Sequence, residues 1–591
     1  MSFHDVTTGL QVSPEKVVGA HSWRVTLPLY VNVGSVEPPA VEFTAPLSPP
    51  LGPADCFERV LWADRGWDKL SDRQKDILVH NVKDRAVFTY DHFCGMLSRE
   101  QISLQILKML NRKCSLDLDT QLVKAYTGTE WCPMKQHWIR GVDPSCQPTH
   151  LCGDIFDRFD ARLHRDVHSH LQARKSGGTH AGLKDVNHKV KDLIDDAYDS
   201  RPQSLRWSPC LLHPDRDHCL VTHCGAEHTI WDNTVDPLTI GTAAPPCVDA
   251  SMMNSQAYGD AGRTFACGCA YLAEARQMNN AINLVECTPR WPVAQLQTAM
   301  QKHGHVTRRF ILKGSALGDL YDRPRCVGLA LASDLLLYSP LEDFVKEMAD
   351  APNNKFTLSS FFVATPEELK VQMEEFRSDR CCERAITDPL FWDWAEILLP
   401  SQRSRLCDYT TLHSQMVMSG KIGANAAAIC DLDQNCGSGH GRLTCDGQKF
   451  PSLLRHGMHW HLRLGRPLVA TELARVHSWP VTAAECEAVG SICCIQSRVV
   501  SGEFRCKDLV KCIGDGWHMK AFGTFWLWLL ANVIRTSDKL PFPRCLSLKD
   551  SDDSQDTTDE PSPKRPRRSL MNSDSPESIS SSGSIGPCDV F

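Results

Sequence analysis

Two short segments carry side chains that could perform covalent chemistry. In AAPPCVDAS, Cys247 follows two prolines and the apolar run PLTIG. Because proline fixes φ, this loop would present the thiol rigidly at the tip of a strand, as a nucleophile requires. In NLVECTP, Glu286 ends another apolar run, where a carboxyl group could act as a general acid or base. A turn with a buried thiol and a solvated strand-end carboxylate are the alternative interpretations.

Two further segments could bind a charged ligand. Arg323 and Arg325 alternate in LGDLYDRPRCVGLA, so in an extended segment they would share one face. Two guanidinium groups on one face suit a phosphate or a base carbonyl. In KCIGDGWHMKAFGTF we expect Gly514 and Gly516 to open a helix, where a backbone can approach a phosphate or another loop closely.

An α/β sheet is the element that would position these residues. Residues 86–160 read as strand, turn, helix and strand: AVFTY, DHFCGML, a helix with its N-cap at Ser98 that runs to about Arg112, and QLVKAY. Residues 233–345 resume this pattern with PLTIG, INLVEC, RRFIL and CVGLALA. Strands that alternate with helices predict a parallel sheet. Open α/β sheets bind ligands at the carboxyl ends of their strands, so we expect Glu286 to point into that crevice.

Composition limits the classes of protein to which the chain can belong. Its 591 residues are 42% hydrophobic and 23% charged, which indicates a folded protein of about two to four domains. A formal net charge of -7 implies that any nucleic-acid surface must be local. No secretory signal is evident, so we expect the 27 cysteines to be reduced in an intracellular protein. The longest apolar run, Phe522–Ile534, is shorter than the about 20 residues of a membrane span and predicts a core helix, with no membrane partner.

In their order along the chain, five segments resemble the cytosine-5 DNA methyltransferase family. PPC resembles the catalytic loop, VEC the segment that usually reads ENV, and the alternating arginines the QxRxR segment. RPLVATELARVHSWP looks like RxLTxREcARLQGFP, and KCIGDGWHMKAFGTF looks like the terminal QIGNAVP segment. The resemblance spans roughly 86–535. It implies a Rossmann-like S-adenosylmethionine-dependent methyltransferase sheet with a second, smaller target-recognition domain.

The resemblance also implies S-adenosyl-L-methionine as the cofactor. HFCGML resembles the family's first glycine loop, and GTEWCPMKQHW resembles the segment in which an acid holds the ribose and the next residue packs on the adenine. HLCGDIFDRF resembles the next strand end, where Asp154 would meet the adenine amino group. The cofactor-binding residues expected from the resemblance are Phe93, Gly95, Glu130, Trp131, Asp154, Ile155, Pro246, Gly514 and Gly516.

Several supporting positions depart from the family pattern. Leu97 stands in place of the second glycine of the first loop, and Val248 follows the catalytic-loop cysteine where glutamine is common. Cys287, Tyr321 and Asp515 replace the usual asparagine, glutamine and asparagine of three other segments. The cysteine, the glutamate and both arginines are kept, so the departures bear on rate and cofactor affinity more than on the type of reaction.

The reaction implied by the resemblance is methyl transfer to carbon 5 of a cytosine in DNA. Cys247 would attack carbon 6 as a thiolate, and Glu286 would bind ring nitrogen 3 and the exocyclic amine. Arg325 would steady the ring carbonyl, and Arg323 would hold the loop or a phosphate. The target base would be flipped out of the duplex. DNA is therefore the expected partner.

The chain divides into five predicted segments. These are an N-terminal extension over 1–85 that is partly disordered, a catalytic domain over 86–345 with an insertion at about 160–232, a target-recognition region over 346–504, a return helix over 505–535, and a disordered tail over 536–591. In the tail, PSPKRPRRS predicts a nuclear localisation signal, and with it the nucleus and a nuclear import receptor. We expect phosphate contacts from the basic residues of 346–504, namely Arg377, Arg380, Arg403, Arg405, Arg442, Arg455, Arg463, His456, His459 and His461.

Three alternatives stay open. A transfer-RNA cytosine-5 methyltransferase of the same fold would use the same PPC and glutamate. A family member with weak or no catalysis could bind DNA alone. A structural zinc knuckle, outside the catalytic site, could form from Cys210, His213, His218, Cys219, His223, Cys224 and His228. A zinc deaminase is rejected, because its H-x-E segment should precede P-C-x-x-C, and Ala250 stands where the second cysteine should be.

Overall fold

The fold is that of a computed structural model, which places most of residues 59–538 and four short strands before them. The described residues are 3–4, 11–17, 20–26, 41–45, 59–85, 87–93, 96–116, 118, 123–141, 147–175, 180–200, 210–213, 237–246, 259–262, 264–321, 323–349, 358–362, 364–380, 394–437, 443–446, 448–450, 453, 457–491 and 494–538. Cys247, Gly95 and the tail with its predicted localisation signal lie outside them.

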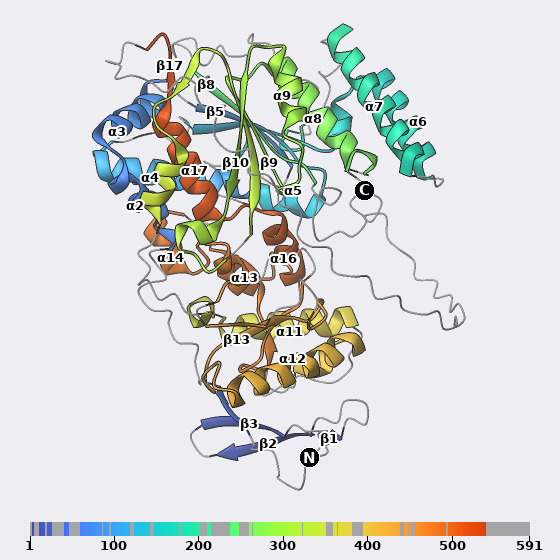
Figure 1. Ribbon diagram of the computed structural model, residues 1–591, viewed down its shortest axis with the longest axis vertical. Helices are drawn as coiled ribbons and strands as arrows, with labels where there is room; N and C mark the ends of the chain where they lie inside the picture. The colour runs from blue at the N-terminus through green and yellow to red at the C-terminus, as the bar shows by residue number, and fades with distance from the viewer. Residues whose placement is uncertain are drawn as a thin grey trace.

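A seven-stranded sheet forms the centre of the molecule (Figure 1), in the order β10-β11-β9-β8-β5-β6-β7. Its strands are β5 (Val87–Phe93), β6 (Val123–Thr129), β7 (His150–Cys152), β8 (Leu238–Ala244), β9 (Ile282–Cys287), β10 (Val306–Leu312) and β11 (Arg325–Leu331). β11 is antiparallel to both of its neighbours, while β5, β6, β7, β8 and β9 pair in parallel. The predicted parallel α/β sheet is therefore confirmed, with one reversed strand near its edge.

Helices cover both faces of this sheet. Along β9, Ile282 and Leu284 pack into one hydrophobic cluster, whereas Val285 packs into another. This alternation follows from the opposite directions of successive side chains in a strand. The first cluster includes α4 (Met96–Cys114) and α17 (Met519–Asn532), and the second includes α8 (Phe265–Met278) and α9 (Ala294–Gln301). Because β9 and β11 are covered on both faces, they read as nearly continuous apolar runs.

The apolar run near the C-terminal end is a core helix, as predicted. Every residue of α17 is buried, and its apolar side chains surround the whole helix. It packs against α2 (Trp62–Lys69), α3 (Asp72–Val79) and the π-helical turn His80–Asp84. Within the described part of the chain, no helix is long and apolar enough to cross a membrane.

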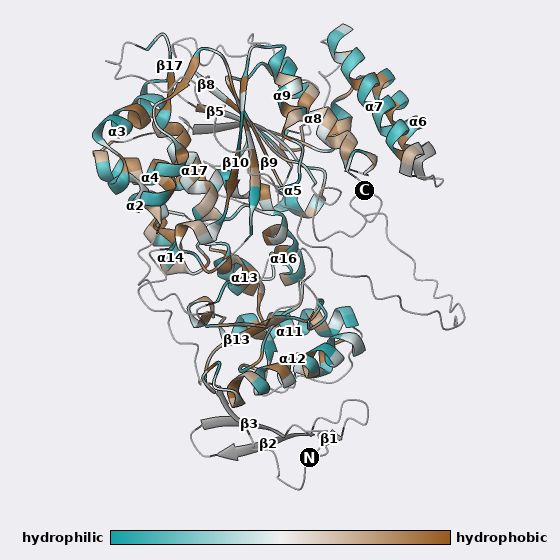
Figure 2. Cartoon of the chain, in the orientation of Figure 1, coloured by the Kyte–Doolittle hydropathy of each residue, from teal (hydrophilic) through white to brown (hydrophobic). Residues whose placement is uncertain are grey.

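The segment predicted as an insertion begins with two helices, α6 (Ala161–Lys175) and α7 (His180–Ser200). They lie against α8 at one side of the sheet (Figure 1). A partly buried ion pair of 2.6 Å joins Asp195 of α7 to Arg276 of α8. In Figure 2, much of α7 is hydrophilic, while hydrophobic colours gather along the central strands.

A second, smaller sheet lies within residues 346–504. It has the order β14-β13-β15-β16 and packs with α11 and α12 around a hydrophobic cluster of its own. The bounds are α11 (Pro366–Arg380), α12 (Pro400–Met418), β13 (Ala428–Asp431), β14 (Thr444–Cys445), β15 (His459–His461) and β16 (Arg466–Pro467).

Three sequence predictions of local structure differ from what is observed. Within the extension predicted to be partly disordered, the described residues form four antiparallel strands in one sheet. The helix predicted to have its N-cap at Ser98 begins at Met96. The single return helix predicted over 505–535 is α16 (Cys506–Asp515), α17 and β17 (Val533–Arg535), because the chain turns at Gly516 and again after Asn532.

Candidate functional site

The strand order reverses between β5 and β8, and open α/β sheets bind their ligands beside the carboxyl ends of the strands at such a point. From β5 the chain continues to β6 and β7 on one side of this point, and from β8 it continues to β9 on the other side. Asp91 anchors the end of β5: its carboxylate forms an ion pair of 2.7 Å with Arg99 of α4 and accepts hydrogen bonds from Thr89 and Thr242. These contacts fix β5 against the first turns of α4 and against β8.

The PPC segment leaves the sheet next to the end of β9. β8 ends at Ala244, and Pro245 and Pro246 follow as buried and half-buried residues. Ala243 pairs with Val285, the residue before Glu286. The chain therefore enters the loop that contains Cys247 one strand away from the carboxylate predicted to act with it.

Glu286 and Arg325 form an ion pair at this edge. Arg325 Nε lies 3.0 Å from a carboxylate oxygen of Glu286, whose side chain is 10% exposed. Because β11 runs opposite to β9, the first residue of β11 lies beside the last residues of β9, and Cys326 pairs with Cys287. Burial raises the pKa of Glu286, while Arg325 and Arg323 lower it in part. This carboxyl group therefore holds a proton to higher pH than an exposed glutamate does.

Arg323 has other contacts than Arg325. Its guanidinium donates to the backbone carbonyl of Gly514 and lies 3.4 Å from His477 Nε2. The two arginines therefore have different partners, although both lower the pKa of Glu286. Arg323 holds the end of α16, and Arg325 holds Glu286.

Gly514 and Gly516 end a helix, contrary to the prediction that they open one. Gly514 lies in the last turn of α16, and Gly516 is its C-cap, with its N–H donating to the carbonyl of Cys512 at 2.8 Å. The following helix starts at Met519, where the His518 side chain accepts from the N–H of Ala521. The glycine pair therefore predicted a helix boundary correctly, but the boundary is the end of a helix and not its start.

Two residues that the sequence did not single out also lie at the site. They are Lys135 and, in the turn after α16, Trp517. Lys135 Nζ lies 2.7 Å from the Asp515 carboxylate, so the acid that replaces the family's asparagine is paired with a buried lysine. Trp517 contributes a hydrogen bond that lowers the pKa of Glu286, and Asp515 raises it. A lysine in the quoted segment GTEWCPMKQHW was the available signal for Lys135.

The residues predicted to hold a nucleoside lie at the ends of β6 and β7. Glu130 follows β6 directly, is buried, and accepts from the N–H of Cys132 at 2.9 Å. Trp131 is half-buried next to it. Asp154 follows β7, caps the turn that begins at Ile155, and has its pKa raised by burial.

Two carboxylates can accept hydrogen bonds from hydroxyl and amino groups, and an indole offers a flat apolar face. The two carboxylates and the indole therefore fit a nucleoside such as that of S-adenosylmethionine. Phe93 is the last residue of β5, and its side chain and Gly95 lie outside the described part of the structure.

Comparisons with solved structures return methyltransferases. The chain matches the S. pombe Dnmt2 methyltransferase with a TM-score of 0.33 and 11% sequence identity, over 76% of this chain and 98% of that chain. It matches Entamoeba histolytica methyltransferase EhMeth with a TM-score of 0.29 and 9% identity, over 75% of this chain and 98% of that chain. No protein-family model and no curated protein matches the sequence.

Tyr321, which stands where the resembled QxRxR segment has glutamine, belongs to a buried network. Its hydroxyl lies 2.9 Å from His477 Nε2 and accepts from the N–H of Leu453 at 3.2 Å. Its ring stacks on His518 at 5.4 Å. Burial lowers the pKa of both histidines, which are therefore neutral near pH 7. The tyrosine thus ties the central sheet to residue 453 in the region of the smaller sheet.

Several basic residues in the region of the smaller sheet form hydrogen bonds within the protein. Arg403, Arg405 and Arg463 each donate to backbone carbonyls. His459 and His461 are buried with pKa values lowered by burial, so they are not charged contacts for a phosphate. The predicted contacts of Arg442, Arg455 and His456 lie outside the described residues.

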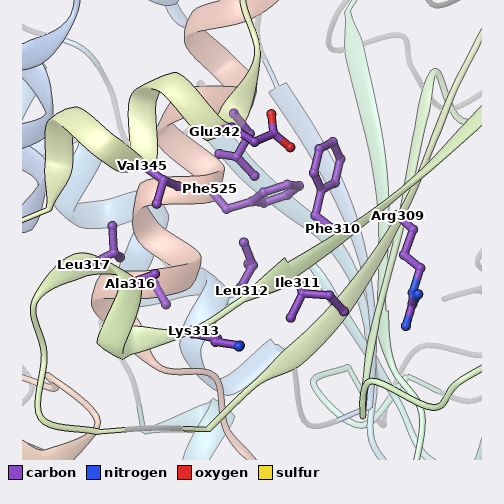
Figure 3. Close-up of a pocket in the computed structure, with 12 residues that line it drawn as sticks. Arg309, Phe310, Ile311, Leu312, Lys313, Ala316, Leu317, Glu342, Val345 and Phe525 are labelled. Carbon is purple, nitrogen blue, oxygen red and sulfur yellow. The ribbon is translucent and has the colours of Figure 1, made fainter. Parts of the chain in front are cut away.

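A cavity of about 170 Å³ lies beside the edge strand β10, between this strand, α10 (Leu341–Met348) and α17. Phe310 and Phe525 face each other there (Figure 3), with ring centroids 5.8 Å apart. Ligand pockets typically enclose about 300–1,000 Å³, so this cavity is too small for a nucleoside cofactor. It is lined by none of the predicted site residues.

Proposed function

We propose that the protein is an S-adenosylmethionine-dependent DNA methyltransferase that acts on carbon 5 of cytosine. The ion pair between Glu286 and Arg325 carries the proposal, because it lies at the carboxyl edge of the sheet, one strand from the point where the PPC loop begins. A carboxyl group with a raised pKa, an arginine and a cysteine nucleophile are the three groups that this reaction needs.

In this proposal, the Cys247 thiolate adds to carbon 6 of a flipped-out cytosine. The electron pair of the 5,6 double bond shifts to carbon 5 and, through carbon 4, to nitrogen 3, where the Glu286 carboxyl group supplies a proton. Carbon 5 of the resulting enamine is then nucleophilic enough to form a bond to a methyl group. Arg325 keeps the carboxyl group oriented and can donate a hydrogen bond to the ring carbonyl. The cofactor, when bound, supplies an electrophilic methyl group. A base then removes the carbon-5 proton. The 5,6 double bond re-forms, the carbon–sulfur bond breaks, and the Cys247 thiolate is released.

The residues proposed to hold the cofactor are Glu130, Trp131 and Asp154. Glu130 would accept hydrogen bonds from the ribose hydroxyl groups, Trp131 would pack on the adenine, and Asp154 would accept from the adenine amino group. Their places at successive strand ends support this assignment, since nucleotides bind across such a crevice in doubly wound sheets.

The test measures transfer of a labelled methyl group from S-adenosylmethionine to duplex DNA and, in parallel, to transfer RNA. Wild type is compared with Cys247→Ser and with Cys114→Ser, a half-exposed cysteine at the end of α4. We expect transfer to DNA that Cys247→Ser abolishes and Cys114→Ser keeps, and a covalent complex on DNA that contains 5-fluorocytosine.

Each contrary outcome removes a different part of the proposal. Transfer to transfer RNA alone would replace the DNA assignment with the RNA one. Cofactor binding without transfer to either substrate would identify a DNA-binding protein without catalysis. Full activity of Cys247→Ser would remove that cysteine as the nucleophile.

We also propose that the basic tail segment binds a nuclear import receptor and directs the protein to the nucleus. Lys564 and Arg565 lie in the run PSPKRPRRS, a pattern typical of such signals. Deletion of 561–570 is expected to shift a fluorescent fusion out of the nucleus, and an unchanged distribution would contradict the assignment.

A further inference from the structure

Three potential metal ligands meet beside the edge strand β7. His150 opens this strand, and Cys210 and His213 come from a short segment 60 residues later in the chain. One ligand atom from each of the three lies within 4.8 Å of the others. The sequence had marked Cys210 and His213 as potential zinc ligands but not His150, which only the fold brings to them.

The geometry of the pair from the short segment fits a tetrahedral ion. Cys210 Sγ lies 3.4 Å from His213 Nδ1. Zinc bonds of about 2.3 Å to sulfur and about 2.0 Å to nitrogen place two ligands of a tetrahedral ion about 3.5 Å apart. A turn in which the N–H of His213 bonds the carbonyl of Cys210 at 3.3 Å holds the two side chains on one side.

Backbone contacts hold the third ligand in place. The N–H of Leu211 donates to the carbonyl of Leu151 at 2.8 Å, so the short segment runs along β7. The rings of His150 and His213 meet edge to face with centroids 5.6 Å apart. Cys210 is buried, while the two histidines are half-buried. The three side chains thus converge from two separate segments.

We propose that His150, Cys210 and His213 bind one zinc ion that fastens residues 210–213 to the edge of the central sheet. A thiolate with two imidazoles suits zinc, whereas calcium and magnesium prefer oxygen ligands. The ion would fix β7 just before the turn that carries Asp154, so its role is structural. The site is separate from the Glu286 and Arg325 pair and does not depend on the proposed reaction.

The test compares the zinc content of the purified full-length protein with that of its variants, by elemental mass spectrometry. Cys210→Ser and His150→Gln are each expected to lower the content by one equivalent per chain. Cys114→Ser, which removes a cysteine outside the cluster, is expected to leave it unchanged. Because the sequence holds further cysteines and histidines at 218–228, the difference between wild type and variant is the measurement.

A spectroscopic measurement covers the case in which a variant folds poorly. Cobalt exchanged into the protein is expected to give a thiolate-to-metal charge-transfer band that is weaker in Cys210→Ser than in Cys114→Ser. If Cys210→Ser is insoluble, His150→Gln takes its place, and its zinc content and cobalt d–d spectrum are compared with those of Cys114→Ser. Equal zinc content in wild type and both cluster variants, or no zinc in the wild type, would overturn the proposal and leave a thiol–imidazole hydrogen bond.

Discussion

Lys135 Nζ lies 2.7 Å from Asp515 Oδ2, and this ion pair joins α5 (Pro133–Arg140) to the end of α16. The lysine side chain is 4% exposed and the aspartate 21%. A buried lysine is costly without a counter-charge. The pair therefore explains how an acid can stand at this position, close enough to raise the pKa of Glu286.

We predict that Asp515→Asn destabilises the protein by about 2–3 kcal/mol, because the buried lysine loses its anionic partner. Urea unfolding measures this free energy. The double variant with Lys135→Met should recover most of the loss, since the cationic group is removed as well. Equal stability of wild type and the single variant would show that the ion pair contributes nothing.

The raised pKa of Glu286 predicts a specific dependence of stability on pH. The native state binds a proton more tightly than the unfolded state, so the free energy of unfolding should fall as pH rises from about 4.3, the unfolded value, to the native pKa. Glu286→Gln cannot ionise. The stability of the variant relative to wild type is therefore expected to increase with pH across this window and then to level off.

The control for this prediction is Glu347→Gln, on an exposed position of α10. Its stability relative to wild type should change little over the same range. If the difference in stability between Glu286→Gln and wild type stays constant with pH, this carboxyl group has the same proton affinity in the native and unfolded states.

The buried pair of Arg59 and Asp319 predicts the opposite dependence. Although burial raises it, Arg59 at 2.8 Å and hydrogen bonding with His518 hold the pKa of Asp319 well below its usual range. This contribution to stability is fully present above about pH 3.9, the unfolded value, and is lost as pH falls toward the native pKa. We expect Asp319→Asn to cost about 3–5 kcal/mol at pH 7 and less at pH 3.

Chemical denaturation at pH 7, 5 and 3 checks this prediction. Asp334→Asn is a matched control, because Asp334 pairs with Arg535 but is 45% exposed. Exposed pairs contribute about 0–1 kcal/mol, so this variant should stay close to wild type at every pH. A cost for Asp319→Asn that does not shrink in acid would contradict the linkage.

Close packing between α17 and α2 predicts a strong effect of one methyl group. A Cβ on Gly523 would lie 2.5 Å from a ring atom of Trp62, which is fully buried. We expect Gly523→Ala to destabilise by about 1–3 kcal/mol through overpacking. Gly268→Ala, in the open interior of α8, should instead stabilise by about 0.5–1 kcal/mol.

The thermal unfolding midpoints of the two variants should therefore move in opposite directions. In a Trp62→Phe background, which shortens the aromatic side chain, the cost of Gly523→Ala should shrink. The same shift for both glycine variants would show that helix propensity alone, rather than the contact with Trp62, decides the effect.

The sequence by itself determined the elements of the central sheet. Apolar runs predicted β8 and β9 and placed Glu286 at the end of its strand, because a strand covered on both faces must be apolar along its length. The uniformly apolar run near the C-terminal end likewise predicted a core helix. The four short N-terminal strands escaped this reasoning, since a proline-rich stretch gives little periodicity.

Only the tertiary structure decided which side chains meet. Glu286 reaches Arg325 because β11 is reversed in the sheet, and Lys135 reaches Asp515 because α5 lies beside the end of α16. His150 joins Cys210 because a segment 60 residues away runs along β7. Strand order, strand direction and the packing of distant helices set these distances, and the local periodicity of side chains encodes none of the three.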